Sequence, residues 1–401
     1  MARMLESAEA ARRLGVKVPT LYAYVSRGLL VSHPAPGRRR SLFAADEVEA
    51  LAKRSRGGRV SETRLATVTT ATTQLRDDGP AYRGTAAVDL AFARPYEEVA
   101  ELLWVGAAGA GAAEAWTPAK VRLPGGLGAS DRLRWAVLAT GAADPLRSDL
   151  RPGAVHAAAR RVIATMVSLV PAAAGSSDGR AAAPLELDDG RVLGDCLAAR
   201  LAVRLSDRPD RALVRAVNAA LVLLADHELA LSTLAVRVAA SARAELCDAL
   251  LAGLGVVAGP RHGGASVLVH RLLVDADRSG VDRALNDALR WQQQLPGFGH
   301  AVYRGEDPRA AVLLQAVDEV ATGPQRALLR KVRARAVDRS RPGPNIDFAL
   351  GALSMAAGMP EDAGLSIFTI ARVAGWTAHY LEELDEPPLR YRARAVYAAR
   401  T

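Results

Sequence analysis

The sequence is poor in cysteine, in aromatic residues and in long uncharged runs, and each shortage excludes a class of protein. Its 401 residues include 2 cysteines, too few for a disulfide-held fold or a cysteine-based zinc site. Aromatic residues make up 4% of the chain, so Ala, Leu and Val must fill the core, which favours helices over strands. The longest stretch without Asp, Glu, Lys or Arg, Val162–Ser177, has 16 residues, whereas a membrane-spanning helix needs about 20.

Familiar signatures are also missing. No Gly-Lys pair occurs, which excludes a Walker A phosphate loop, and no His-Glu-x-x-His metal motif is present. The first residues, Met1–Arg13, lack the apolar run of a secretory signal. We therefore expect a cytoplasmic globular protein with no metal site and no membrane contact.

Positive charge is concentrated near the N-terminus. The chain carries 52 basic and 43 acidic residues, and residues 1–59 contain 12 of the basic and 5 of the acidic ones. A local excess of positive charge attracts phosphate, in nucleic acid or in a phosphorylated ligand. The alternative is that these charges serve only solubility.

The same segment has the signals of a small helical domain. Ser7 can cap a first helix that Gly15 ends, and Pro19 suits the first turn of a second helix that ends near Gly28. A hairpin with an arginine tip is expected next, followed by a helix over Asp46–Lys53.

This order of elements resembles the winged helix-turn-helix of the MerR and excisionase type, over about residues 1–56. The resemblance rests on Ala10–Val16, Thr20–Tyr22 and Arg27–Leu29. It implies that the second helix enters the major groove of DNA and that the wing contacts phosphates. The residues then expected at DNA are Thr20, Tyr22, Tyr24, Arg38, Arg39 and Arg40. A module that only packs or dimerises is the alternative, and residues 53–59 are expected to form a linker.

Beyond residue 60, apolar residues recur at helical spacing, which predicts an all-α body with short loops. The strongest helical ranges are Val88–Trp104, Arg211–Ala225, Ala244–Val257, Ala265–Val274, Ala310–Val320 and Ile367–Leu381. The main strand signal is Arg64–Thr70, and Asp188–Gly194 is expected to be a short polar segment outside the helices, a polar excursion.

Four of the histidines stand in unusual local sequences, and a carboxylate joins them as a candidate. His262 and His300 lie next to glycines, which let the backbone approach a ligand closely. His227 lies between two acidic residues, and His379 follows a Gly-Trp-Thr-Ala stretch. Asp347 leads an uncharged stretch; buried there, it would have a raised pKa and could act as a base. The alternative for Asp347 is a helix N-cap.

Seven segments, in order along about residues 62–397, resemble the citrate synthase family. They are Arg76–Gly84, Asp226–Glu228, Gly259–Gly264, Gly297–Arg309, Asn345–Phe348, Ala371–Trp376 and Arg392–Ala395. The resemblance implies an all-helical fold over residues 57–401, in which a small domain of about 263–358 is inserted in a large one.

The resemblance also implies a reaction, in which an acyl-CoA condenses with a 2-oxo acid and the product thioester is hydrolysed. Asp347 would remove a proton from the acyl α-carbon, His262 would stabilise the thioester oxygen, and His300 would polarise the ketone. The carboxylates of oxaloacetate would meet four residues, the last of them from the neighbouring subunit of a homodimer: His227, Arg309, Arg372 and Arg392. Arg394 is the nearest rival of Arg392.

Coenzyme A is expected as part of the substrate, and the resemblance implies no further cofactor and no metal. Its contacts would be Arg304 and the backbone of Leu295, Pro296, Gly297, Phe298 and Gly299. His379 is interpreted as a packing residue.

Two functional hypotheses remain open from the sequence. The first is an active synthase, with acetyl-CoA as the expected acyl donor and propionyl-CoA, giving 2-methylcitrate, as the alternative. Departures from the family pattern at Ala230 and Ser266 could reshape the pocket, and one methylene is worth only about 1–3 kcal/mol. The second is a DNA-binding regulator whose synthase-like body senses CoA esters or oxaloacetate.

Overall fold

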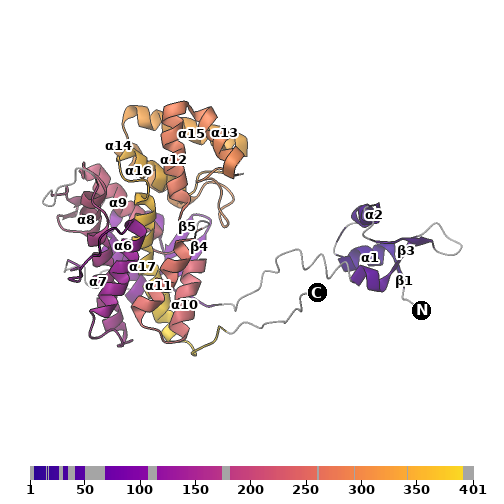
Figure 1. Ribbon diagram of the computed structural model, residues 1–401, viewed down its shortest axis with the longest axis horizontal. Helices are drawn as coiled ribbons and strands as arrows, with labels where there is room; N and C mark the ends of the chain where they lie inside the picture. The colour runs from indigo at the N-terminus through magenta and orange to yellow at the C-terminus, as the bar shows by residue number, and fades with distance from the viewer. Residues whose placement is uncertain are drawn as a thin grey trace. The chain divides into compact units, whose positions relative to one another are not determined.

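The computed structural model describes residues 4–14, 16, 18–26, 30–34, 41–49, 68–106, 115–173, 181–259, 262–292, 294–340 and 342–391. The chain divides into two units, Met1–Val68 and Thr69–Thr401 (Figure 1). The boundary expected after residue 56 and the whole of the expected linker, residues 53–59, fall outside the described residues. Within the described ranges, no helix is long and apolar enough to cross a membrane.

The first unit is a small helix-turn-helix domain with its own core. Helices α1 (Ser7–Leu14) and α2 (Val18–Ser26) contact each other, and β1 (Met4–Glu6), β3 (Ser41–Ala44) and β2 (His33–Pro34) form an antiparallel sheet in the order β1-β3-β2. Residues 45–49 are helical. The helical pair and the hairpin agree with the sequence analysis, whereas β1 was not expected. Ser7 begins α1, and its hydroxyl donates to the Ser41 carbonyl at 3.3 Å.

The second unit is almost entirely helical. Its described helices are α4 (Ala87–Ala93), α5 (Tyr96–Val105), α6 (Ala129–Ala142), α7 (Pro152–Leu169), α8 (Leu197–Leu205), α9 (Arg211–Leu224), α10 (Leu231–Ser241), α11 (Leu246–Val257), α12 (Ala265–Ser279), α13 (Val281–Gln292), α14 (Pro308–Val320), α15 (Gly323–Ser340), α16 (Ile346–Ala356) and α17 (Ala363–Leu384). Helices α9 and α17 are buried along most of their length. Helices α12 to α16 gather at one end of the unit (Figure 1). The boundary of the expected small domain stays a prediction.

Two sequence expectations meet a different outcome in the structure. Of the expected strand Arg64–Thr70, residues 64–67 lie outside the described residues and residues 68–70 are not in a strand. A sheet begins at β4 (Thr73–Arg76), which pairs with β5 (Gly79–Tyr82) and then β6 (Thr85–Ala86). The expected helix Val88–Trp104 is two helices. Pro95 separates them because it lacks an N–H and favours extended backbone at Arg94.

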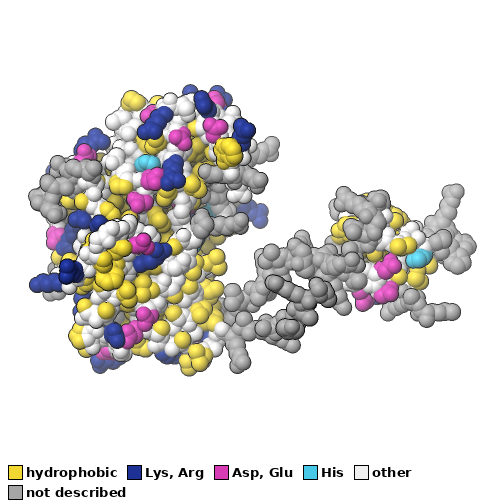
Figure 2. Space-filling model, viewed as in Figure 1, with side chains coloured by type: hydrophobic (Ala, Val, Ile, Leu, Met, Phe, Trp, Pro, Cys, Tyr) yellow, Lys and Arg dark blue, Asp and Glu magenta, His cyan; other side chains and the backbone are white. Residues whose placement is uncertain are grey.

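The polar excursion near residue 190 is a hairpin of β7 (Leu185–Glu186) and β8 (Val192–Leu193). On the face of the second unit seen in Figure 2, basic and acidic side chains are interspersed among exposed hydrophobic ones. The exposed hydrophobic residues of this unit include Leu138 on α6 and Val238 on α10.

Candidate active site

A cavity of about 450 Å³ in the second unit collects seven of the site residues that the sequence predicts. They are His227, His262, Gly299, His300, Arg309, Asp347 and Arg372. These residues come from loops, from helix ends and, for Arg372, from the middle of α17, and they are far apart in the sequence. Apolar side chains complete the lining, among them Leu75, Ile346 and Phe368.

The glycine-rich loop before His300 is held against the segment before α16. The Gly299 N–H donates to the Gly343 carbonyl at 2.9 Å, and the Asn345 N–H donates to the Gly297 carbonyl at 2.9 Å. Gly297 has φ of +81°, and a Cβ there would lie 2.6 Å from Val269. Only glycine fits this close approach, which brings His300 and Asp347 to one cavity.

Asp347 lies in the first turn of α16 without acting as its cap. The cap is Asn345, whose Oδ1 accepts the Asp347 N–H at 3.0 Å and the Phe348 N–H at 3.3 Å. The N-cap alternative for Asp347 was therefore wrong, and its carboxylate faces the cavity. Burial raises the pKa of Asp347 to about 6, and the positive charge of Arg309 opposes this shift. A carboxylate of this kind can accept a proton near neutral pH.

His262 precedes α12 and is held by a serine from α10. Its Nε2 lies 2.8 Å from the Ser232 hydroxyl. Burial, followed by the charge of Arg372, lowers the pKa of His262, so the neutral ring is favoured. If the serine hydroxyl donates to Nε2, Nδ1 carries the proton and can donate it to a ligand. Sequence reasoning missed this role of Ser232, because no local signal links it to a histidine thirty residues later.

His300 and Arg309 present two donors side by side. The Val302 N–H donates to His300 Nδ1 at 3.0 Å, so Nε2 carries the proton of the neutral ring. Arg309 Nη2 lies 3.4 Å from that Nε2, a longer contact than the one at Nδ1 that decides the tautomer. Two donors at this distance can share one acceptor oxygen. Asp307 orients the guanidinium, accepting from Nε at 3.0 Å and from Nη2 at 2.8 Å.

Arg372 is a buried guanidinium with room for an anion. Its Nε donates to the Leu224 carbonyl at 3.0 Å, and within the described part of the chain no carboxylate lies at ion-pair distance from it. Burial lowers the pKa of Arg372, which reflects the cost of its charge. A buried charge of this kind calls for a partner, and a ligand carboxylate in the cavity would supply one.

His227 completes the polar wall. Its Nε2 lies 3.2 Å from the Tyr303 hydroxyl, and its ring meets the His300 ring edge-on at 5.2 Å between centroids. Burial, and then the charges of Arg309 and Arg372, hold the pKa of His227 far below its ordinary range. The ring is therefore a neutral hydrogen-bonding group beside two cations.

The residues expected to contact coenzyme A do not line this cavity, apart from Gly299. Arg304 is exposed, Leu295 is buried, and the Phe298 ring packs against Phe348 at 5.1 Å. Their contact with coenzyme A stays a prediction. Arg392 lies outside the described residues.

In the first unit, Thr20 and Tyr22 are exposed on α2, whereas Tyr24 is half-buried and packs on the core. The expected wing arginines, Arg38 to Arg40, lie outside the described residues. Across the described ranges of both units, no group of three or more His, Cys, Asp or Glu could hold a metal ion.

Fold and cavity together define a helical protein in which a carboxylate, three histidines and two buried arginines line one cavity. The family "Citrate synthase, C-terminal domain" matches residues 56–394, and the family "Helix-turn-helix domain" matches residues 4–56. The chain therefore belongs to the citrate synthase family and carries an N-terminal helix-turn-helix domain.

Similar proteins agree with this assignment. Citrate synthase 2 of Bacillus subtilis is 30% identical over 270 residues, which cover 66% of this chain and 71% of that protein. The citrate synthase of Haloferax volcanii is 36% identical over 196 residues, which cover 47% of this chain and 52% of that protein. The chain spans about half the length of the first curated relatives it matches, 54% for one from Mycobacterium tuberculosis.

Solved structures of citrate synthases share the fold. The enzyme from Thermotoga maritima superposes with a TM-score of 0.66 at 23% identity, over 85% of this chain and 96% of that one. The enzyme from Thermoplasma acidophilum, solved with carboxymethyl coenzyme A and oxaloacetate, gives 0.68 at 22% identity, over 84% and 95%.

Proposed function

We propose that this protein condenses an acyl-CoA, with acetyl-CoA as the expected donor, with oxaloacetate to give citrate and free coenzyme A. The observation that carries the proposal is the shared cavity, where a carboxylate of raised pKa faces neutral histidines and two buried arginines. The relatives named citrate synthase support the same reaction class.

The first step is enolisation of the thioester. Asp347 takes a proton from the acyl α-carbon, and negative charge develops on the thioester oxygen. His262 stabilises that charge through Nδ1–H, because Ser232 occupies its Nε2. Burial and then the charge of Arg372 disfavour a second proton on the ring, and the N-terminus of α12 acts in the same direction, so His262 acts as a neutral donor.

The second step is attack of the enolate carbon on the oxaloacetate ketone. His300 Nε2–H and the adjacent Arg309 Nη2 converge where one oxygen can sit, and His300 protonates the alkoxide that forms. The carboxylates of oxaloacetate take the remaining donors of Arg372 and His227. Water then cleaves the thioester of the condensed product, which releases citrate and coenzyme A.

The first experiment measures thiol release from acetyl-CoA and from propionyl-CoA, each with oxaloacetate. We expect release by the wild type and a loss of about 10²–10⁴ in kcat for Asp347→Asn. Asp318→Asn, an exposed carboxylate on α14, is the matched control and should keep full activity. The ratio of kcat/KM for the two thioesters distinguishes citrate from 2-methylcitrate formation. No release from either thioester, with both ligands bound, would overturn the proposal.

We also propose a homodimer whose sites are completed by Arg392 or its near neighbour Arg394 from the second subunit. Such an interface would cover exposed hydrophobic side chains of the second unit, for example Leu138 or Val238. Sedimentation velocity measures the mass in solution, and a monomer at all concentrations would rule the dimer out.

DNA binding by the first unit is a second candidate function, and the helix-turn-helix match favours it. The exposed residues Thr20 and Tyr22 lie on the second helix of the motif, the one that would enter the major groove. A dimeric body would present two such units, so paired half-sites are expected. Fluorescence anisotropy on genomic fragments tests this: we expect binding at least about 10³-fold tighter than to random DNA, and equal affinity for both would reject it. A change in DNA affinity when acyl-CoA or oxaloacetate is added would show that the second unit acts as a sensor.

A further inference from the structure

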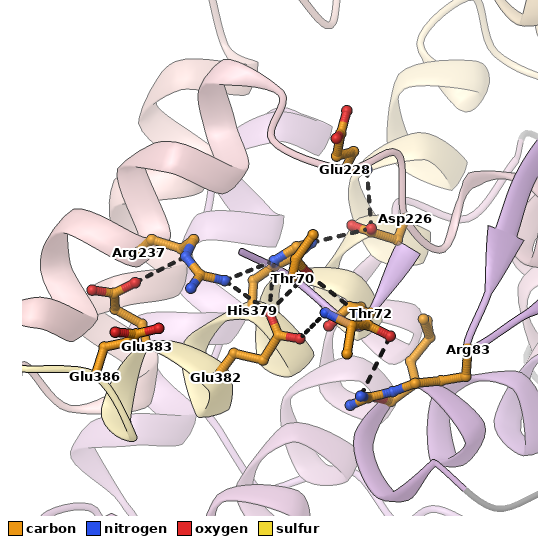
Figure 3. Close-up of polar contacts among 12 residues, drawn as sticks. Thr70, Thr72, Arg83, Asp226, Glu228, Arg237, His379, Glu382, Glu383 and Glu386 are labelled. Atoms are coloured by element: carbon orange, nitrogen blue, oxygen red, sulfur yellow. Dashed lines mark hydrogen bonds and ion pairs between the residues drawn. The ribbon is translucent and has the colours of Figure 1, made fainter. Parts of the chain in front are cut away.

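A chain of polar side chains runs from Asp226 through His379 to Arg237 and Glu382 (Figure 3). It begins at Asp226, which directly precedes His227 and is fully buried. Asp226 Oδ2 accepts the Glu228 N–H at 3.1 Å and lies 3.2 Å from Nε2 of His379, a fully buried residue of α17. One carboxylate oxygen therefore contacts both the residue after His227 and a histidine that the reaction does not use.

The turn that carries His227 needs this support. Glu228 has φ of +55°, in the left-handed region that residues with a Cβ avoid. The bond from its N–H to Asp226 holds that conformation, and the ring of His227 points from the turn toward Tyr303 and the cavity. Movement of Asp226 would therefore change the direction of the His227 ring.

The surroundings of His379 determine where its proton lies. Arg237 Nη1 is 3.1 Å from His379 Nδ1, and because arginine can only donate, Nδ1 must accept. The proton of the neutral ring is then on Nε2, directed at Asp226. Arg237 is itself held by Glu382 and Glu383, each at 2.9 Å. Burial raises the pKa of Asp226, but its interaction with His379, followed by the charge of Arg372 and a hydrogen bond from Thr73, outweighs burial, so its pKa is lowered and its ionised state is favoured.

The same network reaches both described ends of the second unit. Glu382 accepts the Thr70 hydroxyl and the Ala71 N–H, each at 2.8 Å. Glu383 accepts from Arg390 at 2.7 Å and from the Tyr391 hydroxyl at 2.9 Å. The turn under His227 is thus connected through α17 to the first and last described residues of this unit.

We propose that His379 is a positioning residue for the reaction: through Asp226 it holds the Asp226–Glu228 turn that directs His227 at oxaloacetate. Arg237 fixes the tautomer of His379 that donates to Asp226. The inference rests on the proposed function, and it replaces the interpretation of His379 as a packing residue.

The test compares two substitutions of His379. The amide of His379→Gln can donate to Asp226 and accept from Arg237, whereas His379→Leu can do neither. We expect the KM for oxaloacetate to rise at least about 10-fold in the leucine variant and to stay within about 3-fold in the glutamine variant. At saturating oxaloacetate, the KM for acetyl-CoA should change little in both. The proposal would be overturned by an equal rise of the oxaloacetate KM in the two variants, or by an unchanged oxaloacetate KM in the leucine variant.

His270→Leu is the matched control, because His270 makes a hydrogen bond to Ser354 and does not line the cavity. It should lower the melting temperature without changing the oxaloacetate KM. If His379→Leu does not fold, Glu382→Gln replaces it. We expect this variant to raise the KM for oxaloacetate about 3-fold, because Arg237 is less firmly held. Calorimetric titration with oxaloacetate repeats the comparison without turnover. If the wild type releases no thiol, the proposed function is refuted. If the wild type releases thiol and both His379 variants keep its oxaloacetate KM, only the positioning role is refuted.

Discussion

Asp347 is a residue whose burial makes it a better base and at the same time lowers the stability of the folded protein. Its carboxylate lies in a cavity lined partly by apolar side chains, and burial raises its pKa from 3.8 to about 6. A base with a pKa close to the working pH transfers protons efficiently, but its ionised form is poorly solvated in the folded protein. Both consequences can be measured.

The first consequence is a pH profile. Asp347 must be ionised to accept a proton, so kcat/KM for acetyl-CoA should fall as the pH drops, with a midpoint near 6. The initial rate of thiol release between pH 4.5 and 8.5 measures it, and the residual activity of Asp347→Asn should lack this limb. A midpoint near the ordinary aspartate value would mean that burial does not tune this group.

The second consequence is a gain in stability when the charge is removed. Because the folded-state pKa is above the unfolded one, the wild type loses stability as the pH rises through about 6. Asparagine does not ionise, so Asp347→Asn should be more stable than the wild type at pH 8, by about 3 kcal/mol at most, with the difference vanishing below pH 3.8. Urea unfolding at several pH values measures the difference. A variant less stable than the wild type at pH 8 would contradict this account.

At the scale of elements, the site depends on close contacts between helices that carry glycine. Gly351 lies in α16, and a Cβ there would be 2.5 Å from Val269 Cγ1 and 3.0 Å from the backbone nitrogen of His270 in α12. The two helices can approach only because the side chain is absent. Since His262 precedes α12 and Asp347 begins α16, this contact sets the relation between two groups of the site.

Gly351→Ala should therefore separate the two helices. We expect a loss of about 1–3 kcal/mol in the free energy of unfolding, because the backbone of α12 cannot yield as a flexible side chain could. The control is Gly194→Ala, in an exposed loop where a Cβ would meet nothing within 4 Å; it should be neutral or stabilising by up to about 1 kcal/mol. Equal midpoints of urea unfolding for the two variants would show that α12 and α16 are not tightly packed.

At the scale of the whole molecule, two units with separate cores lie on one chain. Leu5, Leu21 and Phe43 belong to a cluster of the first unit, distinct from the core of the second. The first 59 residues hold much of the excess positive charge of the chain, which would favour the proposed contact with DNA phosphates. The second unit holds the described residues of the cavity.

Subunit mixing tests whether sites are shared between subunits. Asp347→Asn and Arg392→Ala should each be nearly inactive alone. If Arg392 acts across the dimer interface, a dissociated and reassociated mixture should regain about a quarter of wild-type activity, because half of the dimers are mixed and each of these has one intact site. Mixing Asp347→Asn with Asp347→Ala is the control and should restore nothing. No recovery in the first mixture would place Arg392 in the site of its own subunit, or outside any site.

Much of the site could be found in the sequence because its signals are local. Glycines beside His262 and His300 and the helical spacing of apolar residues each act over a few residues. The two-domain fold was implied by seven segments that resemble, in order, the citrate synthase family. Local patterns also misled: the apolar period from Val88 to Trp104 continues across Pro95, where the backbone cannot form one helix.

What only the tertiary structure decided depends on contacts between distant segments. Ser232 meets His262, and Asp226 meets His379, across 30 and 153 positions in the chain. Neither pair has a spacing that sequence could reveal, because packing of α10 and α17 brings them together. The pKa of Asp347 likewise follows from what surrounds the carboxylate. The sequence by itself therefore determined which groups are available, whereas the fold decided which of them touch and which carry charge, since desolvation and hydrogen bonding are properties of the packed interior.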